Sequence, residues 1–456
     1  MKRIHFIGIG GISMSGIAQI MKSRGYEVSG SDRSESDMTK YLREAGIPVV
    51  IGQKAENITP DLDIIVYTSA IREDNPELIA ARAAAEKPGG PRVIKRAVIL
   101  GELLDEFPVP VCVAGTHGKT STSSILTYIY MAADLDPAVA IGGILHNLGA
   151  NYRIGHGDHM LIEADEYTDS FLQFHPKYNI ITNIEVDHLD YFKDLADIQD
   201  SFHQYVAGMK EGGVLVTGPD IAPLFADLPV RVLTVSLKEH ADVTAKNIRH
   251  HENDMGLTFD VYMHDECLGP LDLYLPGRHL IYDTLCAVTV ALAENIPFEV
   301  IQKGVAAYRS TQKRFELKGV YHGAKVVDDY AHHPAEIRAT LRSAAEVKHK
   351  ELYVVFQPHT YSRTLYLFDD FVTSLSAADH LILMDIFAAR DEKEAGMVTS
   401  KMLAEAIAKN GTDVHYLPAF DDIIKFLQKN ISTDDLLITM GAGKAVDIAN
   451  HLLSEQ

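Results

Sequence analysis

The chain has 456 residues, of which 46% are hydrophobic, and its formal net charge is −21. This length exceeds what a single hydrophobic core supports, so we expect roughly two to four domains of ordinary size. The negative charge argues against an extended nucleic-acid-binding surface, because such surfaces cluster Lys and Arg to neutralise phosphates.

The cysteines and the N-terminus indicate the compartment. Cys112, Cys267 and Cys286 are too few for a disulfide framework, and no Cys-x-x-Cys pair occurs. We expect all three to be buried structural thiols. The first eight residues carry one basic pair but reach Gly8 without an apolar signal-peptide core or a membrane span. We therefore expect a protein of the reducing cytoplasm that does not act at a membrane.

The first segment alternates strands and helices. Its apolar runs predict strands at residues 4–9, 27–31 and 63–67, and a helix at 12–24. This order is typical of a mononucleotide-binding α/β fold. A turn-rich loop at 86–91 and the run Phe-Pro-Val-Pro at 107–110 then interrupt the pattern. We place the first domain boundary between residues 108 and 109.

The turn after the first strand reads Gly8-Ile9-Gly10-Gly11, and Asp32 follows the second strand. In a dinucleotide-binding fold such a turn holds a diphosphate and such a carboxylate holds a ribose. Ser13, however, takes the place of the third glycine of that fingerprint. Three interpretations stay open: a hydride carrier bound by an oxidoreductase, the diphosphate of a nucleotide substrate, or a tight turn without a ligand.

A second nucleotide motif begins the middle segment, where an apolar strand at 111–114 runs through Gly115-Thr116-His117-Gly118-Lys119-Thr120 into a helix. The glycines let backbone N–H groups turn inward, Lys119 can reach the terminal phosphates, and the Thr120 hydroxyl can bind Mg²⁺. The common P-loop has a glycine where this chain has Val113, so we expect a shorter phosphate loop. The alternative is an ordinary helix N-terminus with a solvated lysine.

The rest of the chain continues the same alternation. In the middle segment we expect strands at 160–163, 178–184 and 213–217, a β-rich region at 257–275, and a helix that ends at 293. In the third segment, which opens near Arg314, we expect strands at 325–328, 352–356, 380–384 and 436–440. The domains are accordingly assigned to residues 1–108, 109–313 and 314–456.

Polar clusters directly follow several of these strands: Asp165-Glu166, the run 183–188, Asp328-Asp329-Tyr330, Gln357-Pro358-His359 and Gly441-Ala442-Gly443. In open parallel sheets ligands bind at the carboxyl ends of strands, so we expect these clusters to be functional. Glu166 and His188 are suitable ligands for a second magnesium ion. The alternative is solvated residues that cap helices, and we assign Glu163, Asp169 and Asp190 to that class. His332 and His333 are either structural or catalytic.

Taken together, these motifs resemble the Mur ligase family. The resemblance rests on Gly8-Ile9-Gly10-Gly11, Met14-Ser15-Gly16, Gly115 to Thr120, Glu163-Ala164-Asp165-Glu166, the run 328–334 and Gln357-Pro358-His359, which match in order along the whole chain. It implies an α/β protein with a Rossmann-like N-terminal domain, a central P-loop-type ATPase domain with a mostly parallel sheet, and a Rossmann-like C-terminal domain.

The resemblance also implies an activity, most closely that of the family branch that attaches L-alanine to UDP-N-acetylmuramate during peptidoglycan precursor synthesis. ATP would activate the lactyl carboxylate as an acyl phosphate, and the amine of L-alanine would then attack it. The cofactors implied are ATP and Mg²⁺. The three domains would bind the UDP portion, ATP with magnesium, and the amino acid, respectively, in a monomer or homodimer.

The resemblance also implies site residues at the individual positions of this chain that match the family's motifs. The UDP-sugar is expected at Gly10, Gly11, Ser15, Asp32 and Ser69. ATP is expected at Gly115, Thr116, His117, Gly118, Lys119, Thr120, Asp283 and Asp329, with magnesium on Thr120, Glu166 and His188. Asp329 would contact either the ATP ribose or the hinge. L-Alanine is expected at His359 and Arg363 with Tyr330 beside them. Arg314 is expected at the entrance to the third domain, and the catalytic residues are expected to be Lys119, Glu166, His188 and Arg314.

The chain departs from the family pattern at a few positions. The family usually has asparagine at the positions of Leu280 and Asp283, one of which contacts adenine, and an aspartate there can accept from the adenine amino group but cannot donate to N7. Thr360 replaces a frequent arginine in the amino-acid site. The alternatives that stay open are a ligase that adds a recycled tripeptide to the same sugar nucleotide, a nicotinamide-dependent oxidoreductase, and a nucleotide-binding regulator without turnover.

Overall fold

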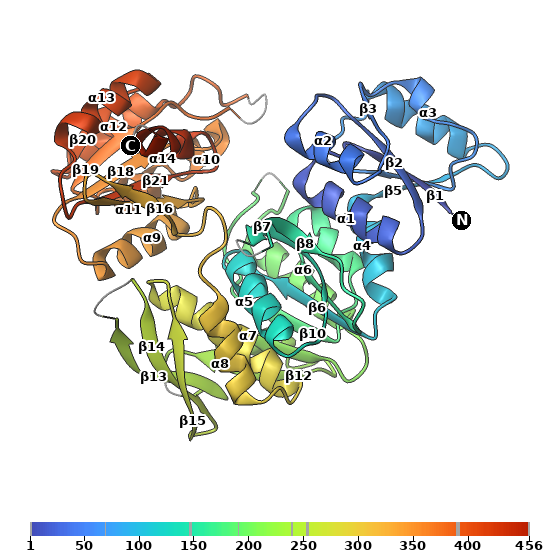
Figure 1. Cartoon of the computed structure of the whole chain (residues 1–456), viewed down its shortest axis with the longest axis horizontal. Helices are drawn as coiled ribbons and strands as arrows, with labels where there is room; N and C mark the ends of the chain where they lie inside the picture. Colours follow the sequence, from blue (N-terminus) through green and yellow to red (C-terminus); the bar gives the residue numbers. More distant parts are fainter. Residues whose placement is uncertain are drawn as a thin grey trace. The chain divides into compact units, whose positions relative to one another are not determined.

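The structure is a computed structural model that describes residues 2–68, 70–145, 148–189, 191–238, 240–251, 255–388 and 393–454. The chain divides into two compact units. The first comprises Met1–Asn247, Phe259–Leu271 and Tyr282–Tyr308, and the second comprises Ile248–Thr258, Asp272–Ile281 and Arg309–Gln456. Three sheets organise the fold, and each is covered by helices (Figure 1). The predicted domain boundaries at 108/109 and 313/314 stay predictions.

The N-terminal sheet has the order β3-β2-β1-β4-β5, and all of its strands are parallel. Along β1, Ile4 and Phe6 pack with helices α1 and α4 on one face, whereas Ile7 packs with α3 on the other, because successive side chains of a strand point to opposite faces. The elements are β1 (Arg3–Ile7), α1 (Ile12–Ser23), β2 (Glu27–Asp32), α2 (Asp37–Glu44), β3 (Val49–Ile51), β4 (Ile64–Tyr67), α3 (Pro76–Ala85), β5 (Arg92–Lys95) and α4 (Arg96–Asp105).

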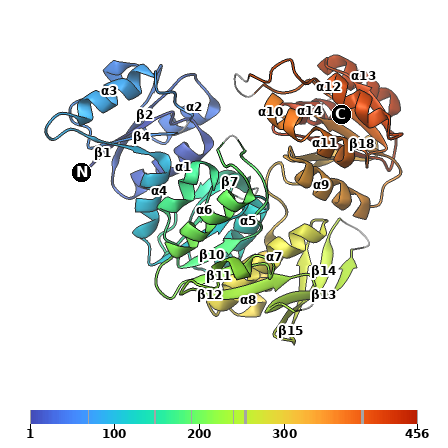
Figure 2. The same cartoon turned by 180° about the vertical axis from the view of Figure 1, so that it is seen from behind.

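The central sheet has the order β15-β14-β13-β12-β11-β10-β6-β9-β7-β8. Its strand β6 (Val109–Ala114) lies between β10 and β9 and is parallel to both, and it is apolar without alternation because both of its faces are buried. Helix α5 covers one face (Figure 1) and α6 the other (Figure 2). The other elements are α5 (Lys119–Ala132), β7 (Ala138–Leu145), β8 (Ala150–Arg153), β9 (His159–Glu163), β10 (Tyr178–Ile181), α6 (Leu195–Ala207), β11 (Val214–Thr217), β12 (Arg231–Ser236), β13 (Val243–His250), β14 (Leu257–Met263), β15 (Glu266–Leu273), α7 (Arg278–Ala293) and α8 (Phe298–Ala307).

The C-terminal sheet has the order β16-β17-β21-β18-β19-β20, and only its edge strand β16 runs antiparallel. Helices α9, α11 and α12 pack on one face, and α13 and α14 pack on the other. The elements are β16 (Glu316–Tyr321), β17 (Ala324–Asp329), α9 (Pro334–Glu346), β18 (Leu352–Phe356), α10 (Tyr361–Tyr366), α11 (Phe368–Leu375), β19 (His380–Leu383), α12 (Ser400–Ala408), β20 (Asp413–Tyr416), α13 (Phe420–Asn430), β21 (Leu436–Met440) and α14 (Ala445–Ser454).

The predicted fold class, a three-domain α/β protein with mostly parallel sheets, is confirmed. Several details were wrong, among them the end of the strand predicted at 178–184, which stops at Ile181. Strand β1 ends at Ile7 instead of residue 9, because the chain turns at Gly8, whose φ is +84°. Cys267 is exposed, since it lies on the edge strand β15, whereas Cys112 and Cys286 are buried as predicted. Within the described ranges, every helix is too short or too polar to cross a bilayer.

Candidate active site

The phosphate-loop motif forms a tight turn between β6 and α5. Gly115 and Gly118 have φ angles of +125° and +85°, a region that favours glycine, and a Cβ on Gly115 would lie 2.2 Å from the Thr182 hydroxyl. The end of β10 braces the turn: the Asn183 side chain accepts from the His117 N–H at 2.8 Å and donates to the His117 carbonyl at 3.0 Å. The turn is therefore held in one shape at the N-terminus of α5, where anions bind favourably.

Lys119 contacts one of the predicted carboxylates. Its Nζ donates to Glu166 Oε2 at 2.8 Å and to the Gly115 carbonyl at 2.5 Å, and Glu166 is only 3% exposed. Burial lowers the pKa of Lys119, but the charges of Glu166 and Asp165 outweigh burial, so the pKa lies above its usual value. The lysine is thus a fixed positive charge at the loop, and the structure brings Lys119 and Glu166 together as predicted.

Glu163 was assigned from the sequence to solvated capping residues, and this was wrong. Its Oε2 accepts from the Thr120 hydroxyl at 3.1 Å, and its Oε1 accepts from the Ser123 hydroxyl at 3.0 Å and the Gly142 N–H at 2.8 Å. The carboxylate therefore fixes the orientation of the Thr120 side chain. A strand-terminal carboxylate three residues before Glu166 was the sequence signal for this role.

His188 lies close to the same site. Its ring packs at a tilt of 34° against the ring of Tyr167, the residue after Glu166, with 4.6 Å between ring centroids, and its backbone has a φ of +53°. In the described residues no group of three or more His, Cys, Asp or Glu side chains is arranged to hold a metal ion. The hydroxyl of Thr120 and the carboxylate of Glu166 nevertheless fit Mg²⁺, which takes few protein ligands and keeps several waters. Asp190 lies outside the described residues.

Asp283 packs directly beneath the loop and is 4% exposed. A Cβ on Gly118 would lie 2.7 Å from Asp283 Oδ1. We expect Gly118→Ala to weaken ATP binding at least tenfold. A left-handed backbone costs an alanine ~1–2 kcal/mol, and in addition the loop must move to accommodate the new Cβ. Titration with ATP, monitored together with the melting temperature, measures this effect.

The matched control is Gly25→Ala, since Gly25 has nearly the same φ, +86°, but nothing within 4 Å of its added Cβ. This variant should lose stability alone. Equal nucleotide affinity in both variants would mean that Asp283 does not constrain the loop.

The glycine turn of the N-terminal sheet is closed by Asp32. Its Oδ2 accepts from the Gly10 N–H at 2.9 Å and its Oδ1 accepts from the Ser34 N–H at 3.4 Å, so this carboxylate holds the turn. Gly11 precedes helix α1 as its N-cap, and Ser15 is buried inside that helix. Ser69, also predicted to bind the sugar nucleotide, lies outside the described residues.

In the second unit, the predicted amino-acid site is a continuous row of aromatic, imidazole and guanidinium groups. The Arg314 guanidinium lies 5.4 Å from the Tyr330 ring, and Tyr330 contacts the His332 ring at 5.1 Å. The His332 and His359 rings are 5.6 Å apart, and Arg363 Nη1 donates to His359 Nδ1 at 3.4 Å. The structure therefore brings Arg314, Tyr330, His359 and Arg363 together, and it adds His332 to them.

Asp329 holds the backbone on both sides of this row. Its Oδ2 accepts from the Phe315 N–H at 2.7 Å, and its Oδ1 accepts from the Ala331 N–H at 2.8 Å and the Thr340 hydroxyl at 3.1 Å. Burial raises the pKa of Asp329, and Arg314 opposes this effect. Asp329 thus positions Arg314 and Tyr330 through their neighbours.

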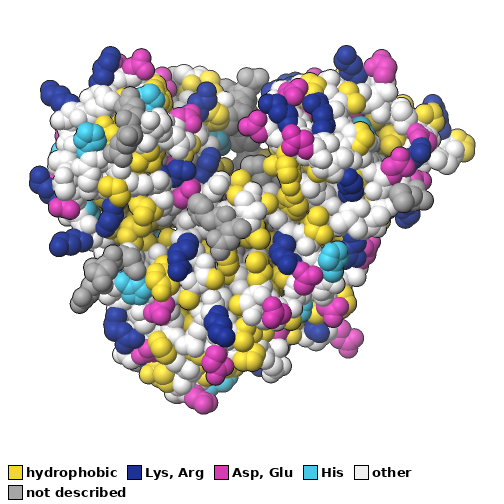
Figure 3. All heavy atoms as spheres, in the orientation of Figure 1, with side chains coloured by type: hydrophobic (Ala, Val, Ile, Leu, Met, Phe, Trp, Pro, Cys, Tyr) yellow, Lys and Arg dark blue, Asp and Glu magenta, His cyan; other side chains and the backbone are white. Residues whose placement is uncertain are grey.

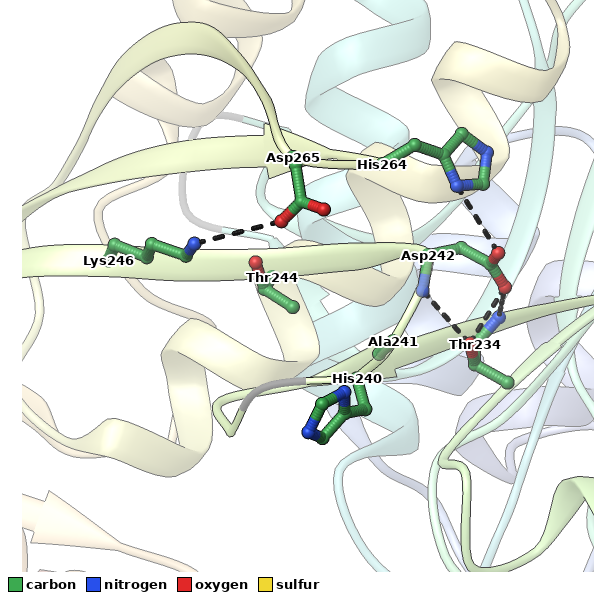
Figure 4. A pocket seen from close by; sticks show the side chains of 8 residues that line it. All are labelled: Thr234, His240, Ala241, Asp242, Thr244, Lys246, His264 and Asp265. Carbon is green, nitrogen blue, oxygen red and sulfur yellow. Dashed lines mark hydrogen bonds and ion pairs between the residues drawn. The ribbon is translucent and has the colours of Figure 1, made fainter.

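A separate pocket of about 580 Å³ lies on β12, β13 and the β14–β15 turn. Figure 4 shows Asp242 directed at Thr234 and His264, and Lys246 at Asp265. Its ionic side chains are largely solvated, and none of the predicted site residues lines it. On the face drawn in Figure 3, Lys and Arg side chains are interspersed with Asp and Glu, as on an ordinary solvated surface.

Comparison with known proteins gives consistent matches along the whole chain. Models of three domains match in order: "Mur ligase family, catalytic domain" at residues 3–108, "Mur ligase middle domain" at 113–291 and "Mur ligase, glutamate ligase domain" at 313–443.

Two curated relatives, from Clostridium novyi (strain NT) and Agathobacter rectalis, are both named UDP-N-acetylmuramate–L-alanine ligase. They are 44% and 42% identical to this chain, respectively. The alignments span 99% of this chain and 97% and 98% of the two relatives. A solved structure of UDP-N-acetylmuramate-alanine ligase MurC from Thermotoga maritima matches with a TM-score of 0.83 at 25% identity. The match spans 100% of this chain and 99% of the solved chain.

Proposed function

The chain belongs to the Mur ligase family, and we infer that it is the ATP-dependent enzyme that joins L-alanine to UDP-N-acetylmuramate in peptidoglycan precursor synthesis. The observation that carries this inference is the match to the alanine-adding relatives over nearly the full length of both chains. Neither the tripeptide-adding alternative nor the oxidoreductase and regulator alternatives are favoured.

We propose that ATP binds at the turn between β6 and α5. The turn formed by Gly115, Thr116, His117 and Gly118 would surround the phosphates, and Lys119 would leave the Gly115 carbonyl to reach the terminal phosphate. A first Mg²⁺ would be held by Thr120 and a second by Glu166 and His188, and the two ions would supply charge neutralisation for phosphoryl transfer. The lactyl carboxylate of the sugar nucleotide attacks the γ-phosphorus, and the oxygen–phosphorus bond to ADP breaks, which leaves an acyl phosphate.

The same proposal assigns the remaining residues. The UDP portion would bind at Gly10, Gly11, Ser15, Asp32 and Ser69, and the adenine near Asp283. The α-carboxylate of L-alanine would be bound by His359 and Arg363, because a guanidinium pairs with a carboxylate through two parallel hydrogen bonds. We propose a cytoplasmic enzyme, since its nucleotide substrates are cytoplasmic metabolites.

Phosphate release is expected to require ATP, Mg²⁺, UDP-N-acetylmuramate and L-alanine together. Each omission should reduce the rate to background. Without L-alanine, no amine is present to discharge the acyl phosphate. A phosphate assay with single omissions measures this, followed by a panel of amino acids and the tripeptide as acceptors. ATP hydrolysis that ignores the sugar nucleotide would contradict the ligase assignment.

A further inference from the structure

The proposed ligation requires a proton acceptor. L-Alanine is present near neutral pH with a protonated amino group, and an ammonium nitrogen has no lone pair with which to attack the acyl phosphate. A general base must therefore lie within hydrogen-bond reach of that nitrogen. Since the carboxylate and the ammonium share one carbon atom, the base must lie close to the group that binds the carboxylate.

His332 has a fixed tautomer that suits this task. Its Nδ1 lies 2.9 Å from the Tyr330 carbonyl oxygen and 3.3 Å from Glu336 Oε2, and both of these groups only accept hydrogen bonds. The hydrogen-bond network therefore assigns the proton of the neutral ring to Nδ1 and leaves the lone pair on Nε2. Within the described part of the chain, no hydrogen bond or ion pair involves Nε2.

The position of His332 is equally suitable. Its ring lies 5.6 Å from that of His359, and His359 in turn accepts from the Arg363 guanidinium at 3.4 Å. An amino acid whose carboxylate is bound by Arg363 and His359 thus has the His332 ring beside it. The neighbouring His333 differs, because its Nδ1 accepts from the Ala335 N–H and caps helix α9.

We propose that His332 is the general base that takes a proton from the ammonium group of L-alanine through Nε2, an inference that rests on the proposed function. The freed lone pair forms the C–N bond to the acyl carbon. The carbon–oxygen bond to the phosphate breaks with its electron pair, and the second nitrogen proton leaves with the inorganic phosphate. His332 afterwards releases its proton to water.

The charges around His332 keep it neutral before the reaction. Burial lowers its pKa, as do Arg363 on α10 and Arg314 before β16, while Glu336 on α9 and the Tyr330 carbonyl raise it. The net pKa lies below the usual 6.5. Because the neutral form is the active one, the rate should rise with pH through a pKa below 6.5 and be constant at neutral pH. Glu336 then stabilises the imidazolium ion that forms.

The test compares two acceptors in the full-length enzyme. Hydroxylamine traps acyl phosphates, and its nitrogen is already neutral at pH 7, so it does not need the base. We expect His332→Asn to lower the alanine-dependent kcat about 10²- to 10⁴-fold, and to leave hydroxamate formation from UDP-N-acetylmuramate and ATP within about twofold. His333→Asn, which retains a helix-capping side chain, is the matched control and should change neither rate more than a few-fold.

A second variant tests the same base without removing it. The Glu336 carboxylate accepts from the backbone N–H groups of His332 and His333 at 3.0 and 3.2 Å. In Glu336→Gln the amide oxygen can still accept both of these hydrogen bonds. The acidic limb of the pH profile should move to lower pH, since the charge that raises the pKa of His332 is gone, and His332→Asn should lack that limb.

The outcomes separate the two proposals. Equal losses with both acceptors, an unchanged alanine rate, or an unchanged acidic limb in His332→Asn would overturn the role of His332 alone. Absence of hydroxamate with the wild-type enzyme would instead contradict the proposed function.

Discussion

Lys119→Ala is expected to reduce ligation at least 10²- to 10³-fold while the affinity for UDP-N-acetylmuramate stays unchanged. The ammonium group is the fixed positive charge of the phosphate loop, and a single preorganised donor that stabilises developing charge typically contributes about this factor. The sugar nucleotide is assigned to the glycine turn after β1, which Lys119 does not contact. Steady-state kinetics and direct titration of the sugar nucleotide measure the two quantities.

The control must separate chemistry from folding. Removal of Lys119 leaves Glu166 without its ion-pair partner at 3% exposure, which can cost ~3–5 kcal/mol of stability. The double variant Lys119→Ala/Glu166→Gln removes that unpaired charge and should recover stability but not activity. Lys210→Ala removes the solvated pair with Asp105 and should be nearly neutral. Equal loss of sugar-nucleotide binding in the Lys119 variants would mean that the two ligands are assigned to the wrong domains.

Arg363→Ala is expected to raise the KM for L-alanine roughly 10- to 150-fold and to leave the KM for ATP within about twofold. A hydrogen bond to a charged group contributes ~1.5–3 kcal/mol, and each 1.4 kcal/mol corresponds to a factor of ten. His359, which accepts from Arg363, would remain as the second carboxylate contact. Initial rates with each substrate varied in turn measure the two constants.

Arg342→Ala is the matched control, because this arginine is exposed on helix α9 of the same unit. It should change neither constant. If Arg363→Ala raised the KM for ATP as much as that for alanine, the assignment of Arg363 to the amino acid would be wrong.

The fold could be predicted from the sequence where burial dictates the residues. Buried parallel strands are continuous apolar runs, so β6, β18 and β21 were found with their bounds nearly correct. The edge strands were harder to predict, because a strand with one solvated face carries mixed residues. The region 257–275 was recognised only as β-rich, and it forms a hairpin whose turn residues His264 and Asp265 both have positive φ.

The site was predictable where a motif is local. Gly118, Lys119 and Thr120 are consecutive, so the sequence alone indicates that they act together. The orientation of a side chain cannot be predicted in this way. Glu163 turned out to hold Thr120 through contacts with residues far away in the chain, and the tautomer of His332 depends on where Glu336 and the Tyr330 carbonyl lie after folding. Such pairings depend on tertiary geometry, which spacing alone does not specify.

The central claim is that the lactyl carboxylate is phosphorylated at the Lys119 loop before L-alanine attacks. UDP-N-acetylmuramate labelled with ¹⁸O in that carboxylate tests it, with mass analysis of the phosphate released during ligation. Transfer of one labelled oxygen into the phosphate is predicted, because the attacking oxygen leaves with the phosphoryl group. Phosphate without label, formed at the same rate as the amide, would contradict the account.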